Sequence, residues 1–234
     1  MILNIETTTN VCSVALSKDG KILCEREDRQ GRSHASLLSC FIWQILNEKN
    51  IAMGDLDAIG VSKGPGSYTG LRIGVSTAKG LCYGSELPLI GIPTLQSLTL
   101  GLFSRLKAQG EKFERDPVFI PMLDARRMEV YSAVLNSNSQ FIRQVEAEII
   151  DEKSYNQWLE KYQVYFFGSG AEKICTIIKH SNARFILGVE PSARDMIPLT
   201  EQKYREEGYE DLAYFEPFYL KDFIATTPKK NIMD

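Results

Sequence analysis

A short stretch near the N-terminus combines an acidic residue with hydroxyl groups, as phosphate-binding turns do. Glu6 ends an apolar segment, and Thr7 and Thr8 follow it before the next apolar segment begins. Such a turn could hold a magnesium nucleotide, with Glu6 acting on the metal through water. An ordinary polar turn is the simpler interpretation, so nucleotide binding is one of two alternatives here.

A glycine-rich segment offers a second place for phosphate. Residues 64–70 read Gly-Pro-Gly-Ser-Tyr-Thr-Gly, between a predicted strand and a predicted helix. Unpaired N–H groups at the start of a helix favour an anion, so Gly64, Gly66 and Ser67 are candidate nucleotide contacts. No Lys-Ser/Thr pair follows the glycines, which excludes a P-loop. The segment is also one residue out of register with GxGxxG, a weak signal for a dinucleotide cofactor.

Histidine, the side chain most often used for acid-base chemistry and metal binding, is scarce. The two histidines, His34 and His180, lie far apart, so no HExxH or HxxxH metal pair can be written. His34 opens one predicted helix and His180 ends another, where a structural role is the simpler interpretation. We therefore predict no catalytic residue and no metal site.

The helix after the glycine-rich segment carries small residues four positions apart. Such a stripe lets another backbone approach closely. Its neighbour is the helix predicted over 33–48, another subunit, or both, and burial inside the same lobe is the plainer alternative. The candidate interface residues on this helix are Gly70, Leu71, Gly74, Val75 and Ala78.

The elements that position these residues follow one order twice: three strands, a helix, a strand, a helix and a strand. In the first half these are strands at 1–6, 11–16, 22–26, 58–62 and 89–92, with helices at 33–48 and 69–83 and a further helix at 95–107. In the second half they are strands at 118–123, 128–135, 141–147, 164–167 and 185–187, with helices at 155–162, 171–180 and 191–207.

This duplication predicts an α/β protein of two lobes, each a mixed sheet with helices on its faces. The polar segment 107–116 separates the halves, so we place the lobes at 1–106 and 107–234. For the last segment, from about residue 214, packing back on the first lobe is an alternative to the second lobe.

Composition narrows the functional classes. The 234 residues include 44% hydrophobic and 24% charged side chains, as in globular proteins, and allow one large domain or two small ones. A net charge of −3 argues against a free-standing nucleic-acid binder. Five scattered cysteines form no CxxC pair, which fits a reducing cytosol. With no basic leader and no apolar run of membrane length, we expect a cytoplasmic protein.

Several of these motifs together resemble the TsaB family, also called YeaZ. Glu6 stands where the family more often has Asp, and the most specific block is the glycine-rich one. The matching segments are 2–7, 32–38, 63–74, 77–80, 124–131 and 216–220.

The resemblance implies the two-lobed fold shared by actin, Hsp70 and sugar kinases. It also implies a non-catalytic scaffold that binds the larger paralogue TsaD, with the ATPase TsaE, and pairs with itself in isolation. That complex transfers a threonylcarbamoyl group to the adenosine next to the tRNA anticodon. This chain would therefore contact tRNA only as part of the complex. TsaD-type proteins carry a metal-binding histidine pair on a helix, where this chain has His34 alone. ATP or ADP is possible at the partner interface.

In this family the two helices of the N-terminal lobe meet those of the partner in a bundle. That implies an interface over residues 33–48 and 69–83, for which we expect Leu38, Phe41 and Ile45 to point outward. Phe41 is the largest apolar residue of this set and our candidate anchor. The first helix contributes the candidates His34, Leu37, Leu38, Phe41 and Ile45.

Two alternatives stay open. A small-molecule kinase or ATPase of the same fold is favoured by Glu6, Thr7, Thr8 and the glycine-rich turn, and is opposed by the lack of a clear second phosphate loop. A dinucleotide-binding domain is opposed by the antiparallel opening, since that fold begins strand-helix-strand.

Overall fold

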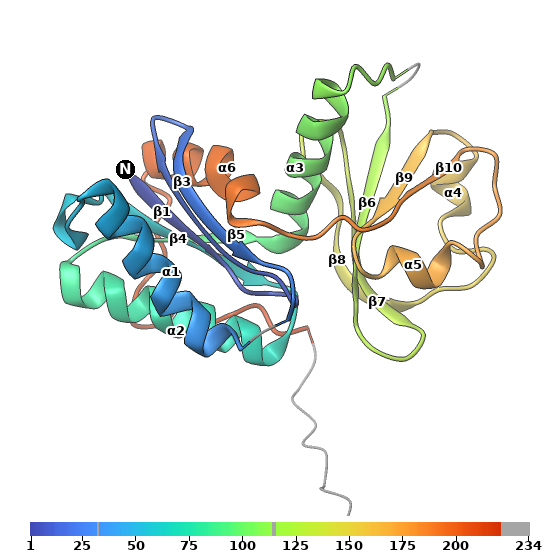
Figure 1. Cartoon of the computed structure of the whole chain (residues 1–234). Helices are drawn as coiled ribbons and strands as arrows, with labels where there is room; N and C mark the ends of the chain where they lie inside the picture. Colours follow the sequence, from blue (N-terminus) through green and yellow to red (C-terminus); the bar gives the residue numbers. More distant parts are fainter. Residues whose placement is uncertain (32, 114–115, 221–234) are drawn as a thin grey trace, which may run out of the picture.

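A computed structural model describes residues 1–31, 33–113 and 116–220. It has two lobes side by side, each built on a five-stranded sheet (Figure 1). Arg32, which belongs to the motif at 32–38, lies outside the described residues. So does the end of the predicted second lobe, 221–234.

The first sheet has the strand order β3-β2-β1-β4-β5. β1, β2 and β3 form an antiparallel meander, while β4 and β5 run parallel to β1. The elements of this half are β1 (Ile2–Glu6), β2 (Cys12–Lys18), β3 (Lys21–Asp28), α1 (His34–Lys49), η1 (Met53–Asp55), β4 (Ala58–Gly64), α2 (Tyr68–Ser85), β5 (Leu89–Pro93) and α3 (Thr94–Ala108).

The second sheet repeats this topology with the order β10-β9-β6-β7-β8. Again the first three strands are antiparallel and the last two parallel to the first. The elements are β6 (Val118–Asp124), β7 (Glu129–Leu135), β8 (Phe141–Ile149), α4 (Asn156–Leu159), β9 (Val164–Phe167), α5 (Ala171–Ile174), β10 (Ala183–Ile186) and α6 (Ala193–Arg205). The predicted α/β fold with two duplicated mixed sheets is confirmed.

Two of the predicted helices are much shorter than expected. The segments 155–162 and 171–180 form only the single turns α4 and α5. Ile174 and Ile178 are both buried in the second lobe. The apolar spacing that predicts a helix therefore reflects two contacts with the core. A single helical turn followed by an irregular turn makes the same two contacts.

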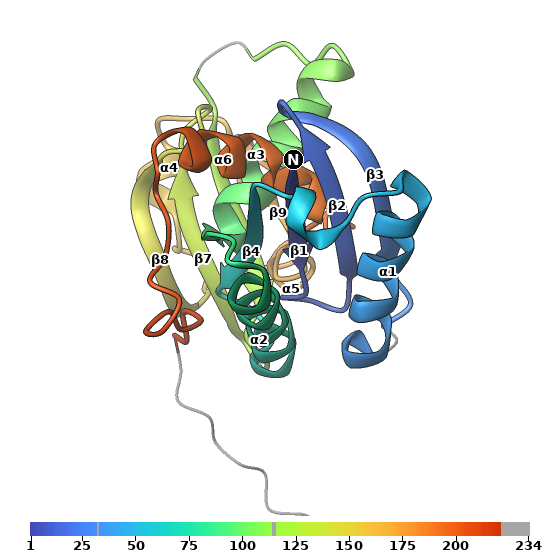
Figure 2. The ribbon, with the colours of Figure 1, turned by 90° about the vertical axis from the view of Figure 1, so that its left-hand side faces the viewer.

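Helices cover both faces of each sheet (Figures 1 and 2). α1 and α2 lie on one face of the first sheet and α6 on the other. α3 packs Leu95, Leu98 and Leu102 against Phe119 of the second sheet. α6 places Met196 on Ile2 and Ile90 of the first sheet. The chain therefore returns to the first lobe before α6, earlier than the predicted residue 214.

Beyond α6 the chain runs across the first lobe as an extended segment, residues 208–219, which we term the C-terminal strap. Glu210 donates its backbone N–H to the carbonyl of Leu89 at 2.9 Å, and Phe218 donates to that of Lys63 at 2.6 Å. Phe215 is 8% exposed in the core of this lobe. The Lys79 ammonium group donates to the carbonyl of Phe215 at 2.9 Å, so the strap is fixed along α2.

Candidate functional site

The turn after β1 holds its acidic residue inside the protein. Glu6 is completely buried, and its carboxylate accepts hydrogen bonds from the Thr8 backbone at 2.6 Å, the Thr8 hydroxyl at 2.5 Å and the Ser62 hydroxyl. Burial raises the pKa of Glu6, and the hydrogen bonds from Ser62 and Thr8 oppose that rise. The hydrogen-bond partners of this carboxylate therefore come from its own turn and from β4.

The glycine-rich loop closes on the same turn. Ser67 donates its N–H to the carbonyl of Thr8 at 2.7 Å, and the Thr7 hydroxyl donates to the carbonyl of Gly70 at 2.8 Å. The Ser67 hydroxyl accepts the N–H of Gly70 and so caps α2. Gly66 lies against Thr8. The fold thus brings the predicted nucleotide residues together, but these groups hydrogen-bond and pack against one another. Gly64, the last predicted residue, lies next to Phe218 of the strap.

The second lobe has a matching arrangement. Asp124 ends β6 as Glu6 ends β1, and its carboxylate accepts the N–H of Arg126 at 2.6 Å and pairs with Lys173. Gly170, in the loop after β9, donates its N–H to Met122 at 3.0 Å. The duplicated topology therefore places an acid at the same strand end in each lobe, one buried and one paired with lysine.

His34 contacts the first-lobe turn. Its Nε2 atom lies 2.7 Å from the carbonyl oxygen of Thr9, which joins the start of α1 to the β1–β2 turn. Among the described residues, no three His, Cys, Asp or Glu side chains are grouped so as to hold a metal ion.

The predicted interface residues divide into two groups. Leu38 is 1% exposed and Ile45 is fully buried, so the expectation that they point outward is wrong. α1 lies along the first sheet, and the apolar period of the helix turns these two residues into the core with Ile42. Of the predicted residues on this helix, His34, Leu37 and Phe41 are half-buried.

The small residues of α2 are likewise turned inward. A Cβ atom at Gly74 would overlap the hydroxyl oxygen of Thr7, so the close approach predicted from the stripe is made with the lobe's own β1–β2 turn. The buried residues of this face are Gly70, Leu71, Gly74, Val75, Ala78 and Cys82.

The opposite side of α2 carries a second stripe, which the sequence reasoning missed. Its residues follow the i, i+4, i+7, i+11 spacing of one helix face. Open space surrounds the Cβ positions of its two glycines, with no atom within 4 Å. Its spacing is visible in the sequence, but the buried glycines of the same helix have the same spacing. We term this stripe the outer α2 face: Ile73, Thr77, Gly80 and Gly84.

Comparison with known sequences identifies the family of the chain. A family profile described as TsaD, tRNA N6-adenosine threonylcarbamoyltransferase, matches residues 21–229. The tRNA threonylcarbamoyladenosine biosynthesis protein TsaB of Escherichia coli is 32% identical over 238 residues, covering 96% of both chains. The chain belongs to the TsaB family. Its counterpart in Haemophilus influenzae is 27% identical, covering 96% of this chain and 94% of its own.

A solved structure gives the same fold. YeaZ from Pseudomonas aeruginosa superposes with a TM-score of 0.76 at 23% sequence identity, covering 94% of this chain and 99% of its own. Within the part of the chain that the structure describes, no helix has the length and apolar character to cross a membrane.

Proposed function

We propose that this chain is a non-catalytic subunit that binds a TsaD-type transferase, together with TsaE, in the complex that modifies tRNA with a threonylcarbamoyl group. The outer α2 face is the observation that carries the proposal. The match to both TsaB relatives and a TsaD profile supports a pairing between paralogues of one fold. In isolation the same face would join two copies of this chain. The chain would contact tRNA only within the complex.

The argument rests on what the exposed glycines do for the protein itself. Glycine within a helix is about 0.5–1 kcal/mol less favourable than alanine. Gly74 is required by the close approach of Thr7, but nothing in the described fold fills the space beside Gly80 or Gly84. The open surface at Gly80 and Gly84 is suited to close packing by an external helix.

Neighbouring apolar residues extend this face. Leu37 and Phe41 of α1, with Leu81 of α2, are half-buried at the edge of the first-lobe core, as is Ile73 of the outer α2 face. A stable interface buries about 800 Å² per partner, and a few anchors dominate its energy. Phe41 is the candidate anchor, and the glycines provide the floor on which a partner helix would lie.

The non-catalytic part of the proposal is supported by the closed first-lobe turn. A kinase or ATPase needs its acidic residue and its glycine loop free to meet nucleotide and metal. Here Glu6 is occupied by Thr8 and Ser62, and Ser67 by Thr8 and Gly70. We expect no ATP turnover by the purified chain, and turnover only after TsaD and TsaE are added.

The test is co-purification with TsaD and TsaE, followed by a tRNA threonylcarbamoylation assay with each component omitted. Gly80→Leu should abolish association and modification while the melting temperature stays near that of the wild type. Gly54→Leu is the matched control, because Gly54 also has open space around it but lies off the two helices. Undiminished association of the Gly80→Leu protein would refute the proposed face.

A second variant tests the anchor. Phe41→Asp places a charge in the half-buried edge of α1, and we expect loss of TsaD capture together with a monomeric mass in solution. Its far-ultraviolet circular dichroism should match that of the wild type. A folded Phe41→Asp protein that still binds TsaD would remove Phe41 from the interface.

A further inference from the structure

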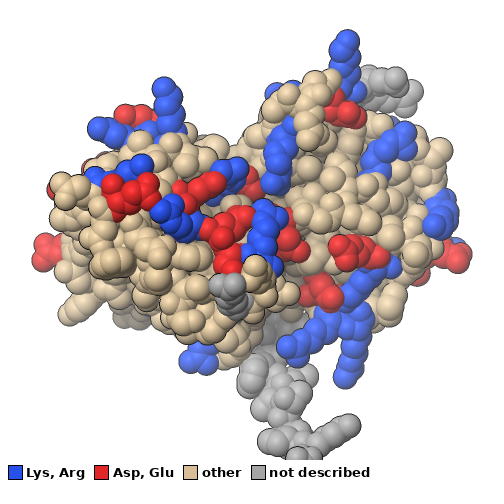
Figure 3. All heavy atoms as spheres, in the orientation of Figure 1, with Lys and Arg blue, Asp and Glu red and all other residues tan. Residues whose placement is uncertain are grey.

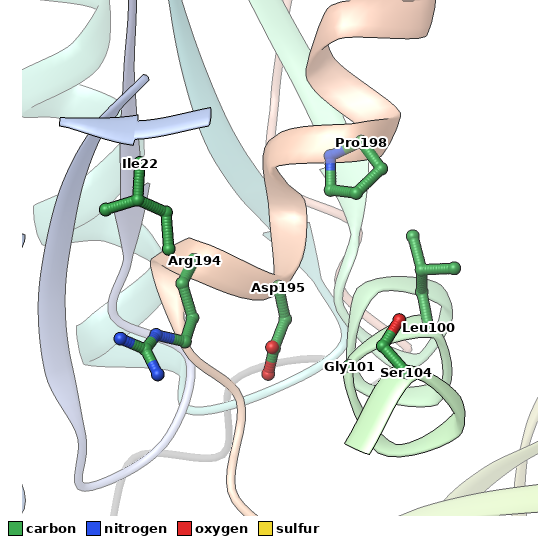
Figure 4. Close-up of a pocket in the computed structure, with 7 residues that line it drawn as sticks. All are labelled: Ile22, Leu100, Gly101, Ser104, Arg194, Asp195 and Pro198. Carbon is green, nitrogen blue, oxygen red and sulfur yellow. The ribbon is translucent and has the colours of Figure 1, made fainter. Parts of the chain in front are cut away.

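A cavity of about 250 Å³ lies at the junction of the lobes, between α3 and α6 (Figure 4). Its polar wall includes Asp195 at the start of α6, with Ser104 on α3 across from it. Its apolar wall is formed by Ile22, Leu100 and Pro198. The sequence reasoning did not single out any of these residues.

The carboxylate of Asp195 is the unusual feature of this cavity. Asp195 is only 8% exposed, and its Oδ2 atom has no hydrogen-bond partner. The nearest cation is the Arg105 guanidinium, 3.6 Å away and beyond hydrogen-bond distance. α3 has Gly101 at the point of contact, where a Cβ atom would overlap the carboxylate. The fold thus makes room for a buried charge that it leaves incompletely satisfied, which is costly.

The other charges at the junction are already paired. Figure 3 shows acidic and basic side chains mixed between the lobes. Arg194, which also lines the cavity, donates from Nε to Glu25 at 2.7 Å and pairs with it a second time through Nη2. Arg29 pairs with Glu27 at 2.5 Å. Asp195 is therefore left with the ion pair to Arg105 at 3.6 Å and no hydrogen bond to its Oδ2 atom.

A proline lies near Asp195 in α6 and adds to the apolar wall of the cavity. Pro198 lies inside the helix and has no N–H group to donate to the carbonyl of Arg194, four residues earlier. Both residues border the cavity. The Asp195 carboxylate and the Ser104 hydroxyl offer acceptors beside apolar walls. A primary ammonium has three donors and no acceptor, so it complements this set.

We propose that this cavity binds a primary ammonium group carried on a short aliphatic chain. The ammonium donates to the Asp195 carboxylate, and the methylene groups lie against Leu100, Ile22 and Pro198. Arg105, whose side chain is 42% exposed, turns toward solvent when the ligand enters.

Calorimetric titration of the full chain tests this site. The probe is n-butylammonium chloride, with butane-1,4-diamine as a second arm that separates a monoamine from a polyamine source. About five non-hydrogen atoms support a dissociation constant of about 0.1–10 mM. The uncharged 1-butanol and the anionic butyrate should bind at least about tenfold more weakly, because neither replaces a charge-assisted hydrogen bond.

Two variants and a control identify the group responsible. Asp195→Asn should weaken binding about 10- to 100-fold, and Ser104→Phe should abolish it by filling the cavity while the carboxylate remains. Asp124→Asn, which removes an exposed carboxylate of the other lobe, should bind like the wild type. Circular dichroism confirms the fold of each variant.

Binding should also weaken from pH 8 to pH 5, because burial raises the pKa of Asp195 to about 6. The charged groups facing it are Arg105 on α3, Arg194 on α6, Glu27 on β3 and Glu6 on β1. Absence of saturation well above the expected range, equal binding of 1-butanol, or undiminished binding by Asp195→Asn would each overturn the proposal.

Discussion

Alanine substitutions at two glycines of α2 should change stability in opposite directions. Gly74 lies against Thr7, where a Cβ atom overlaps the threonine hydroxyl, and Gly80 faces open space. Both positions are inside the same helix, so the gain in helix propensity is common to both. The difference between the two variants therefore measures the packing of α2 on the β1–β2 turn.

The magnitudes follow from the surroundings. Gly80→Ala should stabilise the protein by about 0.5–1 kcal/mol, through helix propensity and the smaller entropy of the unfolded chain. For a chain of this length each kcal/mol moves the melting temperature by about 2–4 °C. Gly74→Ala receives the same gain but overpacks a buried contact, at a cost of about 1–3 kcal/mol. It also displaces the Thr7 hydroxyl from the Gly70 carbonyl, a bond of 2.8 Å worth about 0.5–1.5 kcal/mol.

Thermal unfolding followed by circular dichroism is the assay, with urea unfolding as a second measurement. We expect the melting temperature to rise for Gly80→Ala and to fall by several degrees for Gly74→Ala. Gly84→Ala repeats the favourable case nearer the end of the helix. Equal shifts for the Gly74 and Gly80 variants would show that the inner face is not close-packed, and the assignment of the two faces would fail.

Three further predictions address other parts of the molecule. Asp195→Asn should stabilise the protein at pH 8 by about 2–3 kcal/mol, because the folded pKa of about 6 exceeds the ordinary 3.8. In the wild type the stability supplied by this group is complete below pH 3.8 and is lost as the pH rises through 6; urea unfolding at several pH values should show that loss, and Asp195→Asn should lack it. Phe215→Ala should cost about 3–5 kcal/mol by emptying its place in the first-lobe core, and proteolysis should then cut the strap first. Lys79→Met removes the ammonium that holds the carbonyls of Ala213 and Phe215, so the strap should be cut faster than in the wild type, with a smaller loss of melting temperature than in Phe215→Ala. A strap cut no faster in either variant would refute the role given to these contacts.

The fold could be predicted because its signals are local and occur twice. Alternating strands, the Asp19-Gly20 turn and the amphipathic period of α1 each depend on neighbouring residues. The predicted bounds of β4 and α2 lie within two residues of the observed ones. The predicted lengths of α4 and α5 were wrong, because two buried positions fit a helical period whether or not the chain continues as a helix.

The orientation of residues in the candidate site was harder to predict, since it depends on distant contacts. Both faces of α2 carry glycines at helical spacing, and the contact that distinguishes them comes from Thr7, more than sixty residues earlier in the chain. Leu38 and Phe41 are both apolar, and only the position of the sheet shows which is buried. Asp195 reads as an ordinary acidic residue in the first turn of a helix, and it becomes a buried charge because α3 approaches it with Gly101.

The two faces of α2 make stability and partner binding separable. The inner face fixes the β1–β2 turn through Thr7 and Ser67, whereas no atom of the described fold lies within 4 Å of the Cβ positions of Gly80 and Gly84 on the outer face. A partner can dock on the outer face without displacing any of the inner contacts, as in complexes whose backbones move little on binding. Gly74→Ala should therefore lower the melting temperature yet retain TsaD at temperatures where it stays folded, whereas Gly80→Leu should lose TsaD while remaining stable. If each variant instead lost both properties in proportion, partner binding would depend on the integrity of the whole lobe and not on the exposed stripe.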